Sequence, residues 1–162
     1  MKPHNAVEIA IDGWYGVLSG MAKLQTSGPD GKVSAFLGVP AGEWFGEGSV
    51  LRGDHWRYDV VALRDTTLIG LPLAQFQALY RHNLAFNHYL IERLNLRLGQ
   101  AMAIIESGRL RSPEERVAQY LSHLFWQGMR KINLSQEDLG HLAGLSRQTI
   151  NRVLKQFEAQ GW

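Results

Sequence analysis

The segment from Gln136 to Phe157 limits the fold of this chain more than any other part of the sequence. Gly144 lies between two short apolar patterns, where a tight turn needs the positive φ that glycine adopts at low cost. Ser146 then offers an N-cap, and Gly140 allows two helices to approach closely. The positions expected to face inward are Leu139, Ala143, Leu145, Ile150, Val153, Leu154 and Phe157. The pattern predicts a helix over residues 136–143, a tight turn and a second helix from Ser146.

The outer face of this second helix is polar and basic, with no acidic residue between Ser146 and Gln156. Arginine matches the O6/N7 edge of guanine, glutamine and asparagine match adenine, and hydroxyls near the positive helix end suit phosphates. The residues expected to bind DNA are Ser146, Arg147, Gln148, Thr149, Asn151, Arg152 and Lys155. The alternative is a helical hairpin used only for packing.

The excess of basic residues lies in the C-terminal third of the chain. Nine Lys/Arg balance nine Asp/Glu among residues 1–105, whereas residues 106–162 carry eight against six, the whole net charge of +2. The 162 residues are 45% hydrophobic, which fits one compact domain or two small ones. The absence of cysteine excludes disulfides, thiolate zinc sites, cysteine-ligated iron–sulfur clusters and a cysteine nucleophile, and it fits a cytoplasmic protein.

Residues 1 to about 79 are typical of β-structure. Glycine-containing turns recur at short intervals, with apolar runs at residues 14–18, 33–37 and 58–63 between them. Such spacing predicts a sandwich or barrel. Gly28–Gly31 is the clearest hairpin turn, and Pro72 suits the start of a short helix.

A long helix is predicted over residues 83–107, which contain no proline and only one internal glycine, Gly99. At ~1.5 Å per residue this helix would be nearly 40 Å long, more than a small β-domain can cover. Its apolar residues recur at heptad spacing, so we expect two copies of the chain to pair there. The expected interface is Ile91, Leu94, Leu98, Ala101, Met102 and Ile105. The alternative is a stripe that packs on its own domain.

A further helix is expected to begin in the segment Ser112–Glu115. This segment combines an N-cap, a proline at the first helical position and a glutamate at the third. The expected apolar face is Val117, Tyr120, Leu121 and Leu124, with Gly128 ending the helix.

Taken together, these features resemble the Crp/Fnr family of bacterial transcription regulators. The most specific match is Leu145–Leu154, which is similar to the family's recognition helix and implies that Arg147, Gln148 and Arg152 read bases. Many members have Glu at the position of Gln148, so the preferred operator is expected to differ from the usual family operator.

The resemblance also implies the architecture, an α+β fold in three parts. Residues 1–81 would form a jelly-roll-like β-roll effector domain, residues 82–108 a dimerisation helix, and residues 109–162 a DNA-binding helix-turn-helix of the winged-helix type. It predicts a partial roll without a wing, because the family's elements before the position of Trp14 and after that of Trp162 have no counterpart in this sequence.

A second match is the segment Phe45–Leu51, with Arg57 ten residues after Glu47, which resembles the family's phosphate-binding cassette. In cyclic-nucleotide binders the glutamate holds a ribose hydroxyl and the arginine pairs with the cyclic phosphate. The resemblance places a small effector at Gly46, Glu47, Gly48, Ser49, Arg57 and Tyr58. The alternative is that Glu47 and Arg57 form a structural ion pair.

Two departures disfavour a cyclic nucleotide as that effector. Tyr58 replaces the small Ser or Thr expected after the arginine and fills space where a phosphate would lie. Ala101 and Met102 stand where cyclic-AMP receptors place hydroxyl residues that meet the purine, so purine selectivity should suffer. The sequence therefore predicts no definite cofactor and leaves a cyclic nucleotide open.

No catalytic or metal-binding arrangement is expected; His82 and His88, for example, are six apart on a helix and do not share a face. The prediction is a dimeric, sequence-specific DNA-binding transcription regulator rather than an enzyme. Its partners would be double-stranded DNA and a second copy, with RNA polymerase implied by the resemblance, and no membrane. The alternative is a small-molecule sensor that acts through protein partners without binding DNA.

Overall fold

The computed structural model describes residues 6–7, 12–27, 33–53, 56, 58–107, 112–122 and 133–161. The chain forms two compact units, Met1–Arg97 and Leu98–Trp162. The turn expected at Gly28–Gly31, Leu124, and the helix end expected at Gly128 lie outside the described residues.

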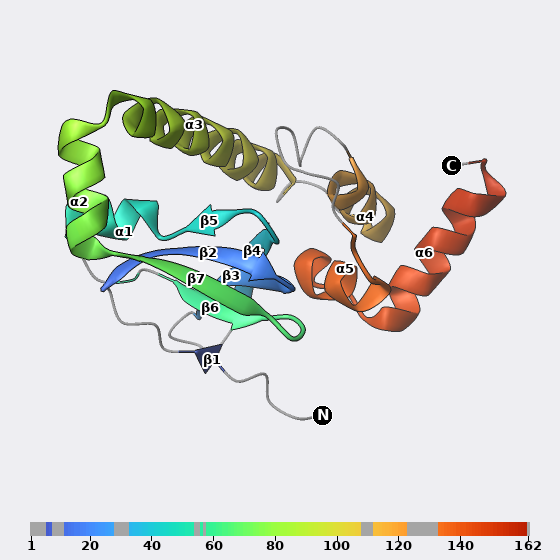
Figure 1. The fold of residues 1–162 in the computed structure, drawn as a ribbon. Helices are drawn as coiled ribbons and strands as arrows, with labels where there is room; N and C mark the ends of the chain where they lie inside the picture. Colours follow the sequence, from blue (N-terminus) through green and yellow to red (C-terminus); the bar gives the residue numbers. More distant parts are fainter. Residues whose placement is uncertain are drawn as a thin grey trace. The chain divides into compact units, whose positions relative to one another are not determined.

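The first unit is a β-roll with helices packed at one end (Figure 1). Its elements in chain order are β1 (Ala6–Val7), β2 (Gly13–Ser19), β3 (Met21–Ser27), β4 (Val33–Pro40), β5 (Trp44–Phe45), α1 (Glu47–Arg52), β6 (Asp59–Ala62), β7 (Thr67–Pro72), α2 (Leu73–His82) and the first part of α3 (Leu84–Ser107). The second unit contains the rest of α3, α4 (Pro113–Leu121), α5 (Gln136–Ala143) and α6 (Arg147–Ala159).

Two antiparallel sheets form the roll, with strand orders β1-β6-β3-β4 and β5-β2-β7. In the first sheet, β3 pairs with β4 from Met21 opposite Pro40 to Ser27 opposite Val33. Alternate side chains of the strands point inward and build an apolar core. Its buried members include Val17, Met21, Leu24, Leu37, Val39, Phe45, Val60 and Val61. This arrangement confirms the predicted β-roll.

Trp14 of β2 connects the roll to its helices. Its side chain is 2% exposed, and its ring centroid lies 4.6 Å from that of Trp44 and 5.5 Å from that of Phe76 in α2. Phe86 and Leu90, in the first turns of α3, complete the cluster. Because these turns are packed, the start of α3 is fixed to the roll. The bounds of α3 confirm the long helix expected from the sequence.

Local hydrogen bonds set the helix starts of the second unit. Ser112 Oγ accepts from the N–H of Glu115 at 3.1 Å, and the Glu115 carboxylate accepts from the N–H of Ser112 at 3.1 Å. Ser135 and Asp138 form the same reciprocal pair at 3.0 Å. Both starts agree with the capping pattern of the sequence.

The turn and the helix starts of the helix-turn-helix are as predicted, whereas Leu145, Leu154 and Phe157, which were expected to face inward, are only partly buried. Gly144 ends α5 with φ of 65°, and Ser146 is the N-cap of α6. The buried core of α4, α5 and α6 consists of Val117, Tyr120, Leu139, Leu142, Ala143, Ile150 and Val153. Leu121 departs from expectation: its side chain is 49% exposed, because it lines an open pocket instead of the core. Of the helices described, none has the length and apolar character needed to cross a membrane.

Two helical glycines should respond oppositely to alanine. A Cβ at Gly99 would meet nothing within 4 Å, so Gly99→Ala should stabilise the fold by about 0.5–1 kcal/mol through the backbone entropy of the unfolded chain. A Cβ at Gly140 would lie 3.0 Å from the Leu145 carbonyl oxygen. Overpacking costs about 1–3 kcal/mol, so Gly140→Ala should destabilise the helix-turn-helix despite its better helix propensity. Urea denaturation measures both, and a stabilising Gly140→Ala would contradict the close approach.

Candidate nucleic-acid interface

Helix α6 divides its residues between a buried and an exposed face. Ile150 and Val153 are both 0% exposed and pack in the core with α4 and α5. Five of the residues predicted to bind DNA lie on α6 outside this buried stripe, and all of them are exposed: Arg147, Gln148, Asn151, Arg152 and Lys155. The polar and basic side chains are therefore free of the core, as a surface that enters a duplex groove requires.

The remaining two predicted residues form the N-terminal cap. Ser146 Oγ accepts from the N–H of Thr149 at 3.2 Å and lies 2.9 Å from Thr149 Oγ1. The first turn of α6 contains no acidic residue, and Arg147 adds a positive charge to the positive end of the helix dipole. This end of α6 therefore favours an anion such as a phosphate.

Helix α4 holds the helix-turn-helix in place within the second unit. Arg116 Nη1 donates to the carbonyl of Ala143, the last residue of α5, at 3.2 Å. Gln119 Nε2 donates to the carbonyl of Ala103, near the end of α3, at 2.8 Å. Together with the buried Val117, these bonds connect α5 and the end of α3 through α4.

Arg152 makes an ion pair that sequence reasoning missed. Its Nη1 donates to Glu114 Oε1 of α4 at 3.0 Å and to Gln156 Oε1 at 3.2 Å. The sequence contains no local signal for the first contact, because Glu114 precedes Arg152 by 38 residues. Arg152 is thus exposed, but its guanidinium already makes two hydrogen bonds.

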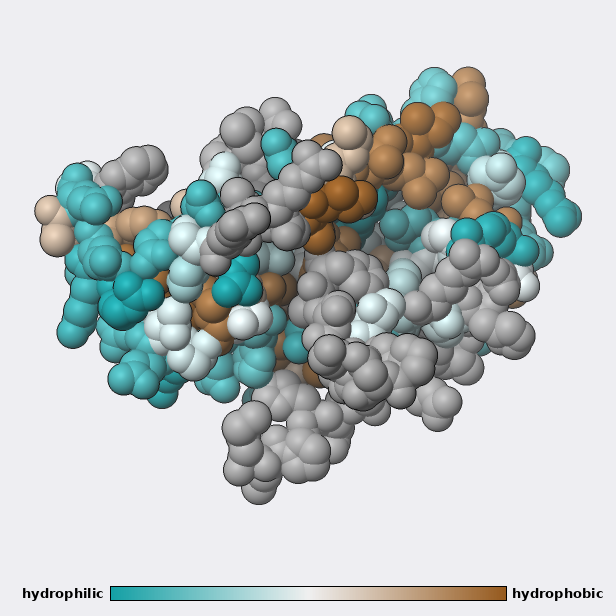
Figure 2. All heavy atoms as spheres, turned by 180° about the vertical axis from the view of Figure 1, so that it is seen from behind, coloured by the Kyte–Doolittle hydropathy of each residue, from teal (hydrophilic) through white to brown (hydrophobic). Residues whose placement is uncertain are grey.

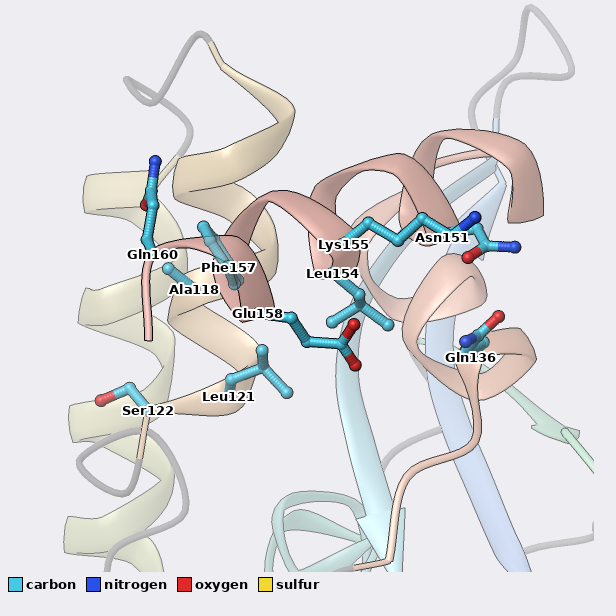
Figure 3. A pocket seen from close by; sticks show the side chains of 10 residues that line it. All are labelled: Ala118, Leu121, Ser122, Gln136, Asn151, Leu154, Lys155, Phe157, Glu158 and Gln160. Carbon is cyan, nitrogen blue, oxygen red and sulfur yellow. The ribbon is translucent and has the colours of Figure 1, made fainter. Parts of the chain in front are cut away.

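An open pocket of about 790 Å³ lies between α4 and α6, beside this surface (Figure 3). Ala118, Leu121, Leu154 and Phe157 give it a largely apolar lining. Asn151 and Lys155 also line it, and the Lys155 side chain extends along α6 towards Asn151 (Figure 3). An apolar lining suits a hydrophobic group rather than a phosphate.

In the first unit, α1 begins in the predicted effector cassette. Gly46 has φ of 94°, and a Cβ there would lie 2.4 Å from Trp56 Cη2, so only glycine fits. Ser49 is buried, and Glu47 and Gly48 are partly buried. Arg57, the expected partner of the phosphate or of Glu47, lies outside the described residues.

The Tyr58 hydroxyl meets the same segment. The backbone N–H of Gly46 donates to it, and burial followed by the nearby Glu47 carboxylate raises the pKa of Tyr58 above its usual value. The phenol therefore stays protonated. Among the residues that the structure describes, Glu47 Oε2 is buried and has no hydrogen-bond partner, so this carboxylate keeps one acceptor for a ligand hydroxyl.

Two arginines of α3 form ion pairs with two glutamates of the first unit. Arg97 Nε lies 3.9 Å from Glu47 Oε1, and Arg93 Nη1 lies 2.5 Å from Glu43 Oε2. Sequence reasoning did not single out Glu43, Arg93 or Arg97. The sequence contains no local signal for the pair of Arg93 and Glu43, because these residues are 50 residues apart.

The face of α3 that bears the predicted interface residues is apolar and exposed. Figure 2 shows hydrophobic residues gathered over this helix. Ala101 is exposed, and the fractional exposures of the other predicted interface residues are 62% for Ile91, 39% for Leu94, 59% for Leu98, 63% for Met102 and 71% for Ile105. A row of exposed apolar side chains of this length is typical of an association surface.

Comparison with known proteins finds a matching protein family for each of the two parts of the chain. Residues 8–83 match the cyclic nucleotide-binding domain, and residues 115–162 match the Crp-like helix-turn-helix domain. The chain is 31% identical over 148 residues to the cyclic AMP receptor protein of Thermus thermophilus, covering 91% of this chain and 68% of that protein. The chain belongs to the Crp/Fnr family.

One further curated relative and one solved structure are also similar to this chain. The cAMP-activated global transcriptional regulator CRP of Haemophilus influenzae is 24% identical over 155 residues, covering 90% of this chain and 69% of that protein. The structure of FixK2 from Bradyrhizobium japonicum superposes with a TM-score of 0.71 at 24% identity, covering 93% of this chain and 76% of that one.

Membership confirms the α+β fold with a β-roll, a long helix and a helix-turn-helix, and it makes the chain a DNA-binding transcription regulator. The named relatives are regulators rather than enzymes. In the described ranges, no three His, Asp or Glu side chains gather where they could hold a metal. The division at residues 81 and 108 and the individual DNA, effector and dimer residues stay predictions.

Proposed function

We propose that this Crp/Fnr regulator binds DNA as a homodimer, with α6 of each copy in the major groove of one half-site. The observation that carries the proposal is the division of α6 into a buried and an exposed part: Ile150 and Val153 are fully buried, whereas the cationic and amide side chains are exposed. Arg147 and Arg152 would contact guanine, and Gln148 and Asn151 adenine. Ser146, Thr149 and Lys155 would contact phosphates.

The dimer would form through the exposed stripe of α3. Paired helices about a two-fold axis would hold two copies of α6 about 34 Å apart, which matches half-sites ~10 base pairs apart. A single recognition helix makes too few contacts for specific binding, so pairing is needed for function. The regulator would act with RNA polymerase on DNA in the cytoplasm, and no catalytic activity belongs to the proposal.

Selection of DNA from a pool of random duplexes, repeated at several salt concentrations, tests this function. We expect enrichment of two-fold symmetric sequences with that spacing, and an affinity that falls with rising salt because phosphate contacts release counterions. A sensor that acts only through protein partners would enrich no sequence.

We further propose that the β-roll does not bind a cyclic nucleotide. The two relatives named for cyclic AMP make this ligand the first candidate effector. In this chain, however, the Tyr58 hydroxyl already accepts the Gly46 N–H, and Trp56 packs on Gly46. The buried Glu47 Oε2 could still accept from a hydroxyl, but the Gly46 N–H, a donor that an anionic group could use, is already bonded to the Tyr58 phenol.

Adding about 1 mM cyclic AMP should therefore change the Tm by less than about 1 °C, because only a bound ligand contributes stability through RT ln(1 + [L]/Kd). Differential scanning calorimetry makes the measurement, with Tyr58→Ser as the matched variant that removes the phenol. A rise of several degrees in the unaltered protein would contradict the proposal.

A further inference from the structure

Arg152 is held by a residue outside the helix-turn-helix. Its Nη1 donates both to Glu114 Oε1 in the first turn of α4 and to Gln156 Oε1 one turn along α6. All of these residues belong to the second compact unit. The guanidinium is therefore held by one hydrogen bond to α4 and one to the next turn of α6.

Both contacts use the same nitrogen. A guanidinium has two N–H groups on Nη1, two on Nη2 and one on Nε, and the Nε and Nη2 groups on one edge point in parallel. Among the described residues, no contact of Arg152 uses that edge. Guanine is read by such a pair of parallel donors, so the edge needed for a base stays open while the other end is anchored.

The pair contributes little to the stability of the fold. The side chains of Arg152 and Glu114 are 54% and 34% exposed, and ion pairs this accessible to water are weak and screened by salt. Glu114 also takes no part in the capping box of α4, which Ser112 and Glu115 form. The contact therefore has little to do with folding, but it restricts an otherwise mobile arginine.

We infer that Glu114 is a positioning residue for base recognition. It orients the Nε and Nη2 edge of the Arg152 guanidinium before DNA binds. This inference rests on the proposed base contact of Arg152. Preorganisation reduces the conformational entropy lost when the base contact forms. The Glu114 charge also repels phosphates, so it weakens binding to DNA of any sequence. Glu114 should thus increase discrimination between bases while lowering non-specific affinity.

The test measures binding of Glu114→Gln to the selected operator, to variants with each base pair changed, and to a random duplex. We expect discrimination at one base pair per half-site to fall about 3- to 10-fold, a fraction of the effect of losing the base contact itself. Affinity for the random duplex should rise. The control Glu158→Gln removes the same charge from α6, where no contact with Arg152 is described, and should alter all duplexes alike.

Arg152→Ala and the double variant separate this inference from the proposed function. In the Arg152→Ala background, Glu114→Gln should no longer change discrimination. If Arg152→Ala relaxes a base pair but Glu114→Gln leaves every base preference intact or sharpens it, the positioning role is wrong and the base contact stands. If Arg152→Ala leaves all preferences unchanged, both are wrong. If the unaltered protein selects no sequence, the proposed function fails.

Discussion

Arg147→Ala is expected to lower affinity for the selected operator by about 1–3 kcal/mol, roughly 5- to 150-fold, and to relax the preference at one base pair in each half-site. Arg147 is exposed in the first turn of α6, at the edge of the stripe that contains the buried Ile150. Because its side chain is not part of the core, the Tm should change little. Fluorescence anisotropy with the operator and its single-base-pair variants measures both effects.

The matched control is Arg81→Ala, which removes one positive charge from an exposed position in α2 of the other unit. It should weaken binding slightly and equally for every sequence, since a charge that contacts no base edge carries no sequence information. An unchanged affinity for the operator in Arg147→Ala would rule out its recognition role. An equal loss on operator and random DNA would instead assign Arg147 to a phosphate.

Leu98→Glu is expected to disrupt the proposed dimer. Leu98 is 59% exposed in the single chain and lies at the centre of the α3 stripe. Exposing two leucines that the dimer would bury costs about 2–4 kcal/mol, and two carboxylates facing each other across the axis add repulsion. The dimer dissociation constant should rise by at least roughly 30-fold, as measured by sedimentation equilibrium. Binding to a two-half-site operator should fall with it.

Gly99→Glu provides the control, since it adds the same charge at the neighbouring position. That position continues a row formed by Glu92 and Glu106, one heptad away on either side, where carboxylates are already present on the exposed surface. This variant should remain dimeric. Binding of Leu98→Glu to a duplex with a single half-site should match that of the unaltered protein, because α6 is not touched. A monomeric unaltered protein, or a dimeric Leu98→Glu, would contradict the proposed interface.

Much of the second unit could be predicted because its signals are local. The helix over residues 136–143, the positive φ of Gly144 and the Ser146 cap all follow from residues within one or two turns of one another. The long helix also follows from periodicity and the absence of proline. Sequence reasoning failed with Leu121, because an apolar residue at helical spacing lies in a core only where another element covers it.

The sequence predicts which residues of α6 are exposed at the candidate site, but it does not predict which other residues they contact. The exposed face of α6 follows from the placement of Ile150 and Val153 one helical turn apart. The partner of Arg152 does not, because Glu114 reaches it only after α4 packs against α6. The same holds for Arg93 and Glu43, which are 50 residues apart in the chain.

Local patterns along the chain were enough to predict a β-sandwich or barrel, a long helix and a helix-turn-helix, because capping, turn chemistry and apolar periodicity act over a few residues. The tertiary structure alone decided that Arg152 is held by Glu114, that the Tyr58 hydroxyl takes the Gly46 N–H, and that the roll anchors α3 through Arg93. Each of these contacts joins side chains that no local pattern relates. They meet only because burial of the apolar faces brings distant segments of the chain together.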